Sequence, residues 1–187
     1  RTKKMSTFFK AHYKKMSQEL EGPNYFRKMI FNSFDYKELE VVQAVKNDLN
    51  QQLELYHKLN PFISPKAKML HLANDYGQLD VLLSLQESQR KIDSFIADEE
   101  KRAVAKTNYI VRKRTIHYLE NREEFEKNSY EVVLISDNKQ EDCTDICKLA
   151  NIVILVNSSN LKEAITAFDF KIDVESENLI ILKKNKP

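Results

Sequence analysis

The chain has 187 residues, 42% of them hydrophobic, and 30 basic against 28 acidic side chains give a net charge of only +2. This is enough apolar material for a folded core, and the charge balance excludes a chain that wraps nucleic acid along its whole length. Two cysteines cannot form a disulfide framework, which indicates a reducing compartment, and no apolar run is long enough for a membrane span. The sequence has only two glycines and no initiator Met. We therefore expect a fragment of an intracellular protein, nuclear or cytoplasmic.

Helical periodicity predominates in the first part of the chain. Apolar residues recur every three or four positions over residues 5–20, and a short aromatic helix follows at residues 25–31. Asp35 and Glu38 have the spacing of a capping box and predict a long helix over residues 35–59. Ser64-Pro65 predicts the start of a helix that ends at Gly77.

The pattern changes along the second half. Residues 79–85 suit either a buried strand or a helix, and residues 98–122 predict a long helix with acids in its first turn. Beyond residue 128, apolar runs predict strands that alternate with helices, which is typical of parallel βαβ units. The strands are expected at residues 131–136, 152–156 and 179–182, and the helices at 143–149 and 160–168.

The predicted fold class is therefore α/β, with a helix-rich N-terminal portion packed on a small, mainly parallel sheet. Residues 1–60 are expected as a helical extension and residues 61–187 as the α/β region. Because no linker rich in Gly, Ser or Pro separates them, we expect one compact unit.

The C-terminal run VVLISDN, a helix, ANIVILV and SSNLKEAI resembles the C-terminal half of PIN-like domains. These are α/β/α nucleases related to RNA-decay endonucleases, and inactive PIN-like folds occur in silencing scaffolds of the TASOR type. The resemblance covers about residues 60–172 and implies a three-layer α/β/α fold. It also implies that Asp137, Glu87, Asp98 and Glu99 are the catalytic acids if the domain is active, with Asp137, Glu87 and Asp98 holding Mg²⁺ or Mn²⁺.

One departure from the PIN-like pattern decides the functional hypothesis. The first strand of that family ends in an Asp, and the corresponding stretch LELYHKLNPFI has none. We therefore expect no catalysis and no cofactor, and interpret the chain as a degenerate PIN-like module for protein or RNA contacts in an RNA-processing or silencing assembly. The alternatives are a metal-dependent single-strand ribonuclease and a purely structural helical scaffold.

Basic residues suggest RNA as a partner. Residues 1–16 carry six cations and no acid, with Phe8, Phe9 and Tyr13 among them, and a second cluster follows at Arg112–Arg114. Cations interleaved with rings bind single strands through phosphates and stacking, although a helix with its rings buried gives the same pattern. The expected RNA-binding residues are Lys3, Lys4, Lys10, Lys14, Lys15, Arg112, Lys113 and Arg114. The helices 35–59 and 98–122 are also expected to dock other proteins.

Other site chemistry has little support in the sequence. Cys143 and Cys147 share a helix face, but a structural zinc site needs four ligands, so we expect core cysteines. The four histidines have no recognisable Ser or Cys nucleophile motif beside them, and P-loop and dinucleotide fingerprints are absent from the sequence.

Overall fold

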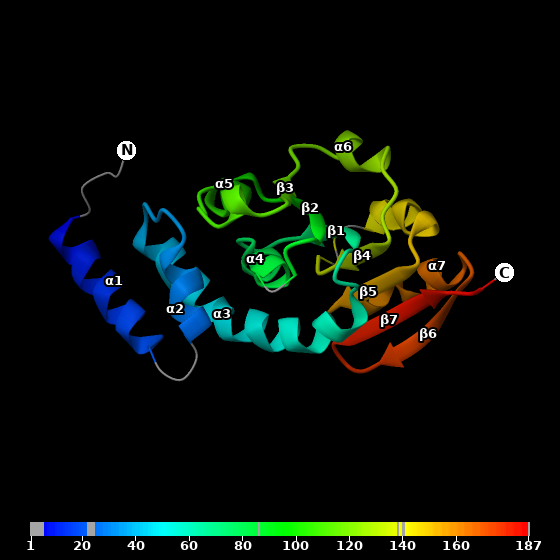
Figure 1. Cartoon of the computed structure of the whole chain (residues 1–187), viewed down its shortest axis with the longest axis horizontal. Helices are drawn as coiled ribbons and strands as arrows, with labels where there is room; N and C mark the ends of the chain where they lie inside the picture. The colour runs from blue at the N-terminus through cyan, green and yellow to red at the C-terminus, as the bar shows by residue number, and fades with distance from the viewer. Residues whose placement is uncertain (1–5, 22–24, 86, 138, 140, 187) are drawn as a thin grey trace.

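The structure is a computed structural model that describes residues 6–21, 25–85, 87–137, 139 and 141–186. Three α-helices precede the first strand, strands and helical segments alternate after it, and the last two strands follow one another directly (Figure 1). The helices are α1 (Thr7–Glu19), α2 (Tyr25–Asn32), α3 (Leu39–Leu59), α4 (Gln78–Leu85), α5 (Glu99–Lys106), α6 (Glu123–Glu126) and α7 (Lys162–Thr166). The 3₁₀ segments are η1 (Asn60–Phe62), η2 (Val111–Lys113), η3 (Glu141–Leu149) and η4 (Ser159–Leu161).

Seven strands form one sheet in the described part of the chain, in the order β3-β2-β1-β4-β5-β7-β6. β1 to β5 run parallel to one another, and β7 runs antiparallel to both β5 and β6. The direction of strand order therefore reverses between β1 and β4, which lie side by side in the centre. The strands are β1 (Lys68–Ala73), β2 (Lys91–Ile96), β3 (Ile116–Tyr118), β4 (Val132–Ile135), β5 (Ile152–Val156), β6 (Phe170–Glu175) and β7 (Leu179–Lys184).

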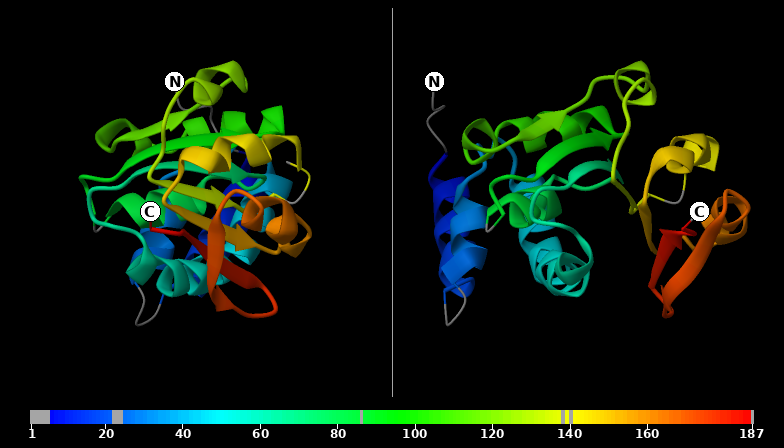
Figure 2. Two further views of the ribbon diagram at one scale, coloured as in Figure 1. Left: turned by 90° about the vertical axis from the view of Figure 1, so that its right-hand side faces the viewer. Right: turned by 45° about the vertical axis from the view of Figure 1, so that its right-hand side comes forward.

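Helices cover both faces of the sheet (Figures 1 and 2). On one face, Met69, Leu134 and Ile154 pack in the same core cluster as residues of α1 to α4. On the other face, Leu72 and Val153 pack with residues of η3, η4, α6 and α7. Side chains along each central strand alternate between the two clusters, which explains why these strands are apolar throughout.

The first helices form because their apolar stripes have a sheet to pack against. Ser6 caps α1, since its Oγ accepts a hydrogen bond from Phe9 N. The helix predicted within residues 35–59 is confirmed as α3, and its apolar stripe is buried inside the chain: Val42, Val45, Leu49, Leu53 and Tyr56. The capping box at Asp35 is wrong, because α3 begins after Glu38, whose side chain makes no cap hydrogen bond.

A buried arginine joins the end of α3 to the second strand. The Arg90 side chain is 1% exposed, and its guanidinium donates to backbone oxygens of Ile63 at 2.6 Å and Leu83 at 3.0 Å. It also donates to Asn60 Oδ1 at 2.7 Å. These hydrogen bonds fix the connection from α3 into β1, which is the strand that carries the candidate site.

The structure corrects two predicted helices. Residues 64–77 contain β1 rather than a helix, and residues 98–122 contain the eight-residue α5, then η2 and β3. Both errors have one cause: β1 is buried on both faces and β3 has only three residues, so neither shows a clear two-residue alternation. The ambiguous residues 79–85 are helical, in α4. The strands predicted at 131–136, 152–156 and 179–182 are confirmed as β4, β5 and β7.

No helix in the described ranges is long and apolar enough to cross a membrane.

Candidate functional site

Open α/β sheets bind ligands beyond the carboxyl ends of their strands, where the strand order reverses. In this chain that place is the edge where β1 and β4 end, which we call the carboxyl edge. The loops after β1, β2 and β4 meet there because the three strands are parallel. They bring residues 74–78, 97–98 and 136–137 to one side of the molecule.

Side chains organise the loop after β1. Asp75 is 7% exposed, and its Oδ1 accepts a hydrogen bond from Gly77 N at 2.8 Å. Gln78 Oε1 accepts from Tyr76 N at 3.1 Å. Gln78 is fully buried, and its Nε2 has no hydrogen-bond partner among the described residues. The loop therefore holds a buried donor without a hydrogen-bond partner among the described residues.

Gly77 is required by both conformation and space. Its φ is +82°, in the left-handed region that glycine adopts without strain. A Cβ added there would lie 2.2 Å from Tyr118 Oη and 3.1 Å from the Cβ of Ala105. Tyr118, at the end of β3, thus reaches past β2 and rests on the loop after β1, with its hydroxyl 3.5 Å from Gly77 O.

The most strongly constrained group at this edge is His71 in the middle of β1. Its side chain is fully buried, with Nδ1 2.7 Å from Asp80 Oδ1 of α4. Its Nε2 lies 2.7 Å from Ser136 Oγ, which directly follows β4. Asp80 is fully buried as well, whereas Ser136 is half-buried. One imidazole therefore links β1, α4 and β4 at the point where the strand order reverses.

Burial and charge shift the ionisation of this cluster. Burial lowers the pKa of His71, but the Asp80 carboxylate, through its charge and hydrogen bond, and then Asp75 outweigh burial and raise it above the usual value. Burial raises the pKa of Asp75, with His71 opposing that shift. Burial also raises the pKa of Tyr118 well above its usual value, and the charges of Asp80 and Asp75 add to the effect. The folded state therefore binds protons at His71 and Asp75 more tightly than the unfolded chain.

The end of β2 adds an exposed acidic turn. Asp98 caps α5, because its Oδ1 accepts hydrogen bonds from Glu100 N at 2.9 Å and Lys101 N at 3.0 Å. Lys101 Nζ donates to Asn74 O at 3.2 Å and lies 5.7 Å from the centre of the Tyr76 ring. These contacts hold α5 against the loop after β1, so the two loops have fixed relative positions.

The structure does not bring the predicted acids together. Asp98 and Asp137 lie at the carboxyl edge, but Glu87 precedes β2 and so lies at the opposite edge. The six residues of β2 separate the two edges by about 20 Å. The Glu99 side chain is 90% exposed, and in the described ranges no group of three or more His, Cys, Asp or Glu side chains could hold a metal ion. The structure therefore does not bring Asp137, Glu87 and Asp98 together as a metal site.

The structure describes only some of the predicted basic residues and cysteines. Lys10, Lys14 and Lys15 are exposed on α1, Lys113 is exposed and Arg114 is half-buried. Lys3 and Lys4 lie outside the described residues, as does the Arg112 side chain. Among the three rings of the basic helix, Phe8 is 63% exposed, Phe9 is buried and Tyr13 is half-buried. Cys147 is a core residue, as expected, and the Cys143 side chain lies outside the described residues.

Several solved structures that superimpose on this chain are methyltransferases. No protein-family model and no curated protein sequence matches this chain. Magnesium protoporphyrin IX methyltransferase (ChlM) of Synechocystis, with SAH bound, superimposes with a TM-score of 0.58 at 8% identity, over 93% of this chain and 100% of that one. M. capricolum TrmK with SAH gives 0.52 at 18% identity, over 71% and 68% of the two chains. A putative tRNA (m1A22) methyltransferase of Streptococcus pneumoniae gives 0.54 at 16% identity, over 73% and 71%.

The chain has the fold of these methyltransferases. This finding overturns the PIN-like resemblance and the two hypotheses built on it: the non-catalytic silencing or RNA-processing module, and the ribonuclease. It also overturns the expectation of no enzyme and no cofactor other than Mg²⁺ or Mn²⁺, because structures with this fold hold SAM or SAH. The physical reason for the error is that a strand ending in Ser-Asp, followed by a helix and a second parallel strand, occurs in both architectures.

Sequence reasoning missed the His71 cluster because its partners are distant along the chain. Asp80 is 9 residues from His71 and Ser136 is 65 residues away. The available signal was a histidine within an apolar strand, which in a buried position requires a polar partner.

The ionisation of His71 predicts a pH dependence of stability. Because its pKa is raised on folding, its contribution is fully present below about pH 6.5 and is lost as the pH rises through the folded pKa. The free energy of unfolding, measured by urea denaturation between pH 5 and 9, should therefore fall with rising pH, by about 1.4 kcal/mol for each unit of the shift. In Asp80→Asn, which removes the raising charge, the slope should flatten. An unchanged slope in this variant would contradict the assignment.

Proposed function

We propose that this chain is a methyltransferase that binds an S-adenosyl ligand at the carboxyl edge of β1, β2 and β4. The observation that carries the proposal is the sheet order β3-β2-β1-β4-β5-β7-β6 with its antiparallel β7, together with the likeness to structures that hold SAM or SAH. The order places a reversal point between β1 and β4, where this sheet class binds ligands.

The residues at that edge suit the chemistry of such a ligand. The methionine part carries an ammonium and a carboxylate, and SAM adds a positive sulfonium. Asp75 offers a carboxylate for the ammonium, and the unpartnered Gln78 Nε2 offers a buried donor for the carboxylate. Asp98, at the end of β2 and about twenty residues beyond the β1 loop, offers an acceptor for ribose hydroxyls. The two carboxylates also favour a cation through charge.

The loop differs from a glycine-rich cradle in its means of holding a ligand. Gly77 is the one glycine of the loop, so a ligand can approach the backbone closely at that residue. The neighbouring positions Asn74, Asp75 and Tyr76 carry side chains, which would contact the ligand instead. The hydrogen bonds of Asp75 and Gln78 to the loop backbone hold these side chains in place. When bound, the S-adenosyl group would supply an electrophilic methyl group. The chain's own residues would orient it and shield it from water.

Calorimetric titration of the whole chain with SAH and with SAM tests this proposal. We expect saturable binding of both, and Asp75→Asn should weaken it at least tenfold, because a hydrogen bond to a charged group contributes about 1.5–3 kcal/mol. Asp145→Asn is the matched control, since Asp145 is an exposed acid of η3 that pairs with Lys148. Absence of binding, or equal weakening by the control, would overturn the proposal.

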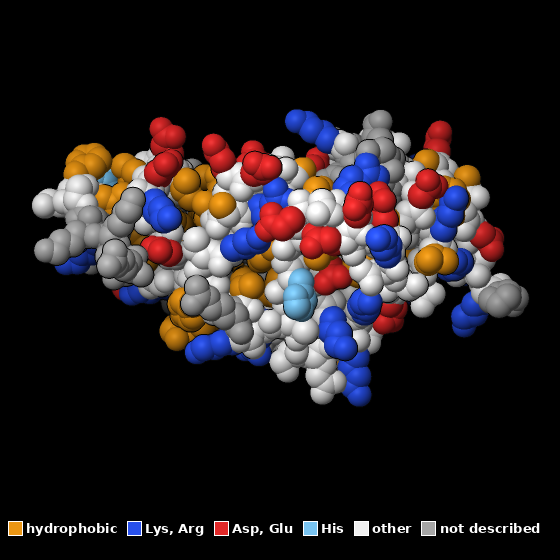
Figure 3. Space-filling view, turned by 90° about the horizontal axis from the view of Figure 1, so that it is seen from above, with side chains coloured by type: hydrophobic (Ala, Val, Ile, Leu, Met, Phe, Trp, Pro, Cys, Tyr) orange, Lys and Arg blue, Asp and Glu red, His pale blue; other side chains and the backbone are white. Residues whose placement is uncertain are grey.

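A second proposal concerns RNA, and it rests on α1. Residues 6–18 carry three exposed lysines and no acid, and the 63% exposed Phe8 ring lies beside them. The face seen from above in Figure 3 has interspersed cations and acids, and hydrophobic side chains gather at the end that carries α1. We propose that this end contacts single-stranded RNA through phosphates and one stacked base. Docking of protein partners stays a prediction.

Salt dependence tests the RNA proposal. If about four cations touch phosphates, the log–log slope of affinity against salt is roughly −2.8, which is about fiftyfold between 50 and 200 mM. The variant in which Lys10, Lys14 and Lys15 become Gln should lose most of this slope. Truncation is unsuitable because Phe9 and Met16 belong to the core.

The matched control replaces three exposed lysines elsewhere, Lys66, Lys127 and Lys171, by Gln. Both variants lose three charges, so a non-specific charge effect would lower affinity equally in both. Equal effects, or no binding by the unaltered chain at low salt, would contradict a role for α1.

A further inference from the structure

We propose that Ser136 is a nucleophile, activated by His71 and Asp80, that accepts an acyl group from an activated ester. The proposal stands on geometry at the carboxyl edge and is independent of S-adenosyl binding. It assigns an activity to side chains that the methyl-transfer proposal does not use.

The three side chains have the mutual arrangement that an activated serine requires. A nucleophile must lie about 2.6–3.2 Å from its base, and a third group must orient the base. Ser136 Oγ lies 2.7 Å from His71 Nε2, and Asp80 Oδ1 lies 2.7 Å from His71 Nδ1. The carboxylate thereby keeps a proton on Nδ1 and directs the lone pair of Nε2 towards the serine. Asp80 is a positioning residue in this arrangement.

Burial divides the three groups into a supporting pair and a reacting group. His71 and Asp80 are fully buried, so packing holds both in one geometry. Ser136 is half-buried and follows the last residue of β4, and its backbone N donates to Leu72 O at 3.0 Å. The serine backbone is thus anchored to β1, while its side chain lies at the edge of the sheet that reaches solvent.

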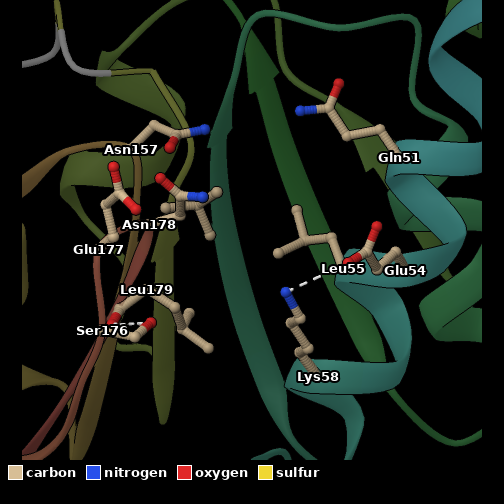
Figure 4. A pocket seen from close by; sticks show the side chains of 10 residues that line it. Gln51, Glu54, Leu55, Lys58, Asn157, Ser176, Glu177, Asn178 and Leu179 are labelled. Carbon is tan, nitrogen blue, oxygen red and sulfur yellow. Dashed lines mark hydrogen bonds and ion pairs between the residues drawn. The ribbon is translucent and has the colours of Figure 1, made fainter.

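On the same face of the sheet, a cavity of about 320 Å³ opens one strand away from this serine, between α3 and the ends of β5 and β7 (Figure 4). Val156 lines it, and its neighbour Leu155 pairs with Ile135, the residue before Ser136. Leu134, two residues before Ser136, belongs with Val156 to the core cluster on the α3 side of the sheet. The alternation of side chains along β4 therefore directs Ser136 to the face on which the cavity lies.

The lining of the cavity suits a short acyl group with a polar end. In Figure 4, Leu55 and Lys58 point from α3 towards the hairpin that carries Asn178 and Leu179. Leu55 and Leu179 supply apolar contact, and the side-chain amides of Asn157 and Asn178 supply hydrogen-bond donors on the opposite wall. We therefore assign small acyl esters as the substrate class.

The reaction balances with water as co-reactant. Ser136 Oγ forms a bond to the acyl carbon while its proton passes to His71 Nε2, and the ester C–O bond breaks as the leaving alcohol takes that proton. Water then attacks the acyl-serine and gives its proton to His71. The acid is released, and the proton returns to Ser136 Oγ.

A fluorophosphonate probe tests the proposal without knowledge of the natural ester. Intact-mass analysis of the folded chain should show one adduct, and peptide mapping should place it on Ser136. Ser136→Ala should lower the labelling rate more than 100-fold. Ser88→Ala is the matched control, because Ser88 is an exposed serine near the opposite edge of the sheet, and it should label as the unaltered chain does.

The pH profile separates an activated serine from one that is merely accessible. The groups that face His71 are Asp80 from α4, Asp75 from the β1 loop and Ser136 from β4, with Tyr118 of β3 close to both acids. Labelling should increase as His71 loses its proton, above pH 6.5, and Asp80→Asn should move the midpoint to lower pH. Absence of an adduct, or equal labelling of Ser136→Ala, would overturn the proposal, as would a rate that does not change with pH.

Discussion

The hydrogen bonds of the buried His71 imidazole hold the centre of this structure together. The side chain lies in β1, and each of its nitrogens lies 2.7 Å from an oxygen of a different element, α4 or β4. A buried polar group that loses its partner costs roughly 1–3 kcal/mol, and a buried charge costs more. If β1, α4 or β4 moved, the buried side chains of this cluster would lose their hydrogen-bond partners. Asp75, Gly77 and Tyr118 then pack around this pair and give the carboxyl edge its shape.

The strand order places the loops around the His71 cluster at one edge of the sheet. Because β1, β2 and β4 are parallel neighbours, the loops after them meet at one edge, although they come from residues 74–78, 97–98 and 136–137. α3 closes the adjoining face, and Arg90 fixes the connection from α3 into β1. The same edge thus offers carboxylates and a buried amide donor on the β1 side, and on the other side an oriented serine one strand away from the cavity at the end of β5. The β1 side supports the proposed binding of an S-adenosyl ligand, and the serine supports the proposed acyl transfer.

The parts of the fold that could be predicted from sequence are those with local signals. The stripe of α3 and the β-branched runs of β4 and β5 are continuous along the chain, and they formed as expected. β1 was mistaken for a helix, because its apolar run is short and contains a histidine whose partners lie 9 and 65 residues away. β6 carries charged residues such as Lys171 and Asp173 at the sheet edge, which hides a strand from any hydrophobic pattern. At the site, Asp137 was placed correctly at the end of a strand and Asp98 at the start of a helix, but the acids do not converge, since Glu87 belongs to the opposite edge.

The central claim is that the carboxyl edge of β1, β2 and β4 is a ligand site. Backbone amide chemical shifts of the ¹⁵N-labelled whole chain, recorded with and without SAH, test it most directly. The account predicts that perturbations concentrate at residues 74–78, 97–98 and 136–137, with α1 and the β6–β7 hairpin unchanged. Absence of perturbation at saturating SAH, or perturbations confined to the opposite edge around Glu87, would contradict it.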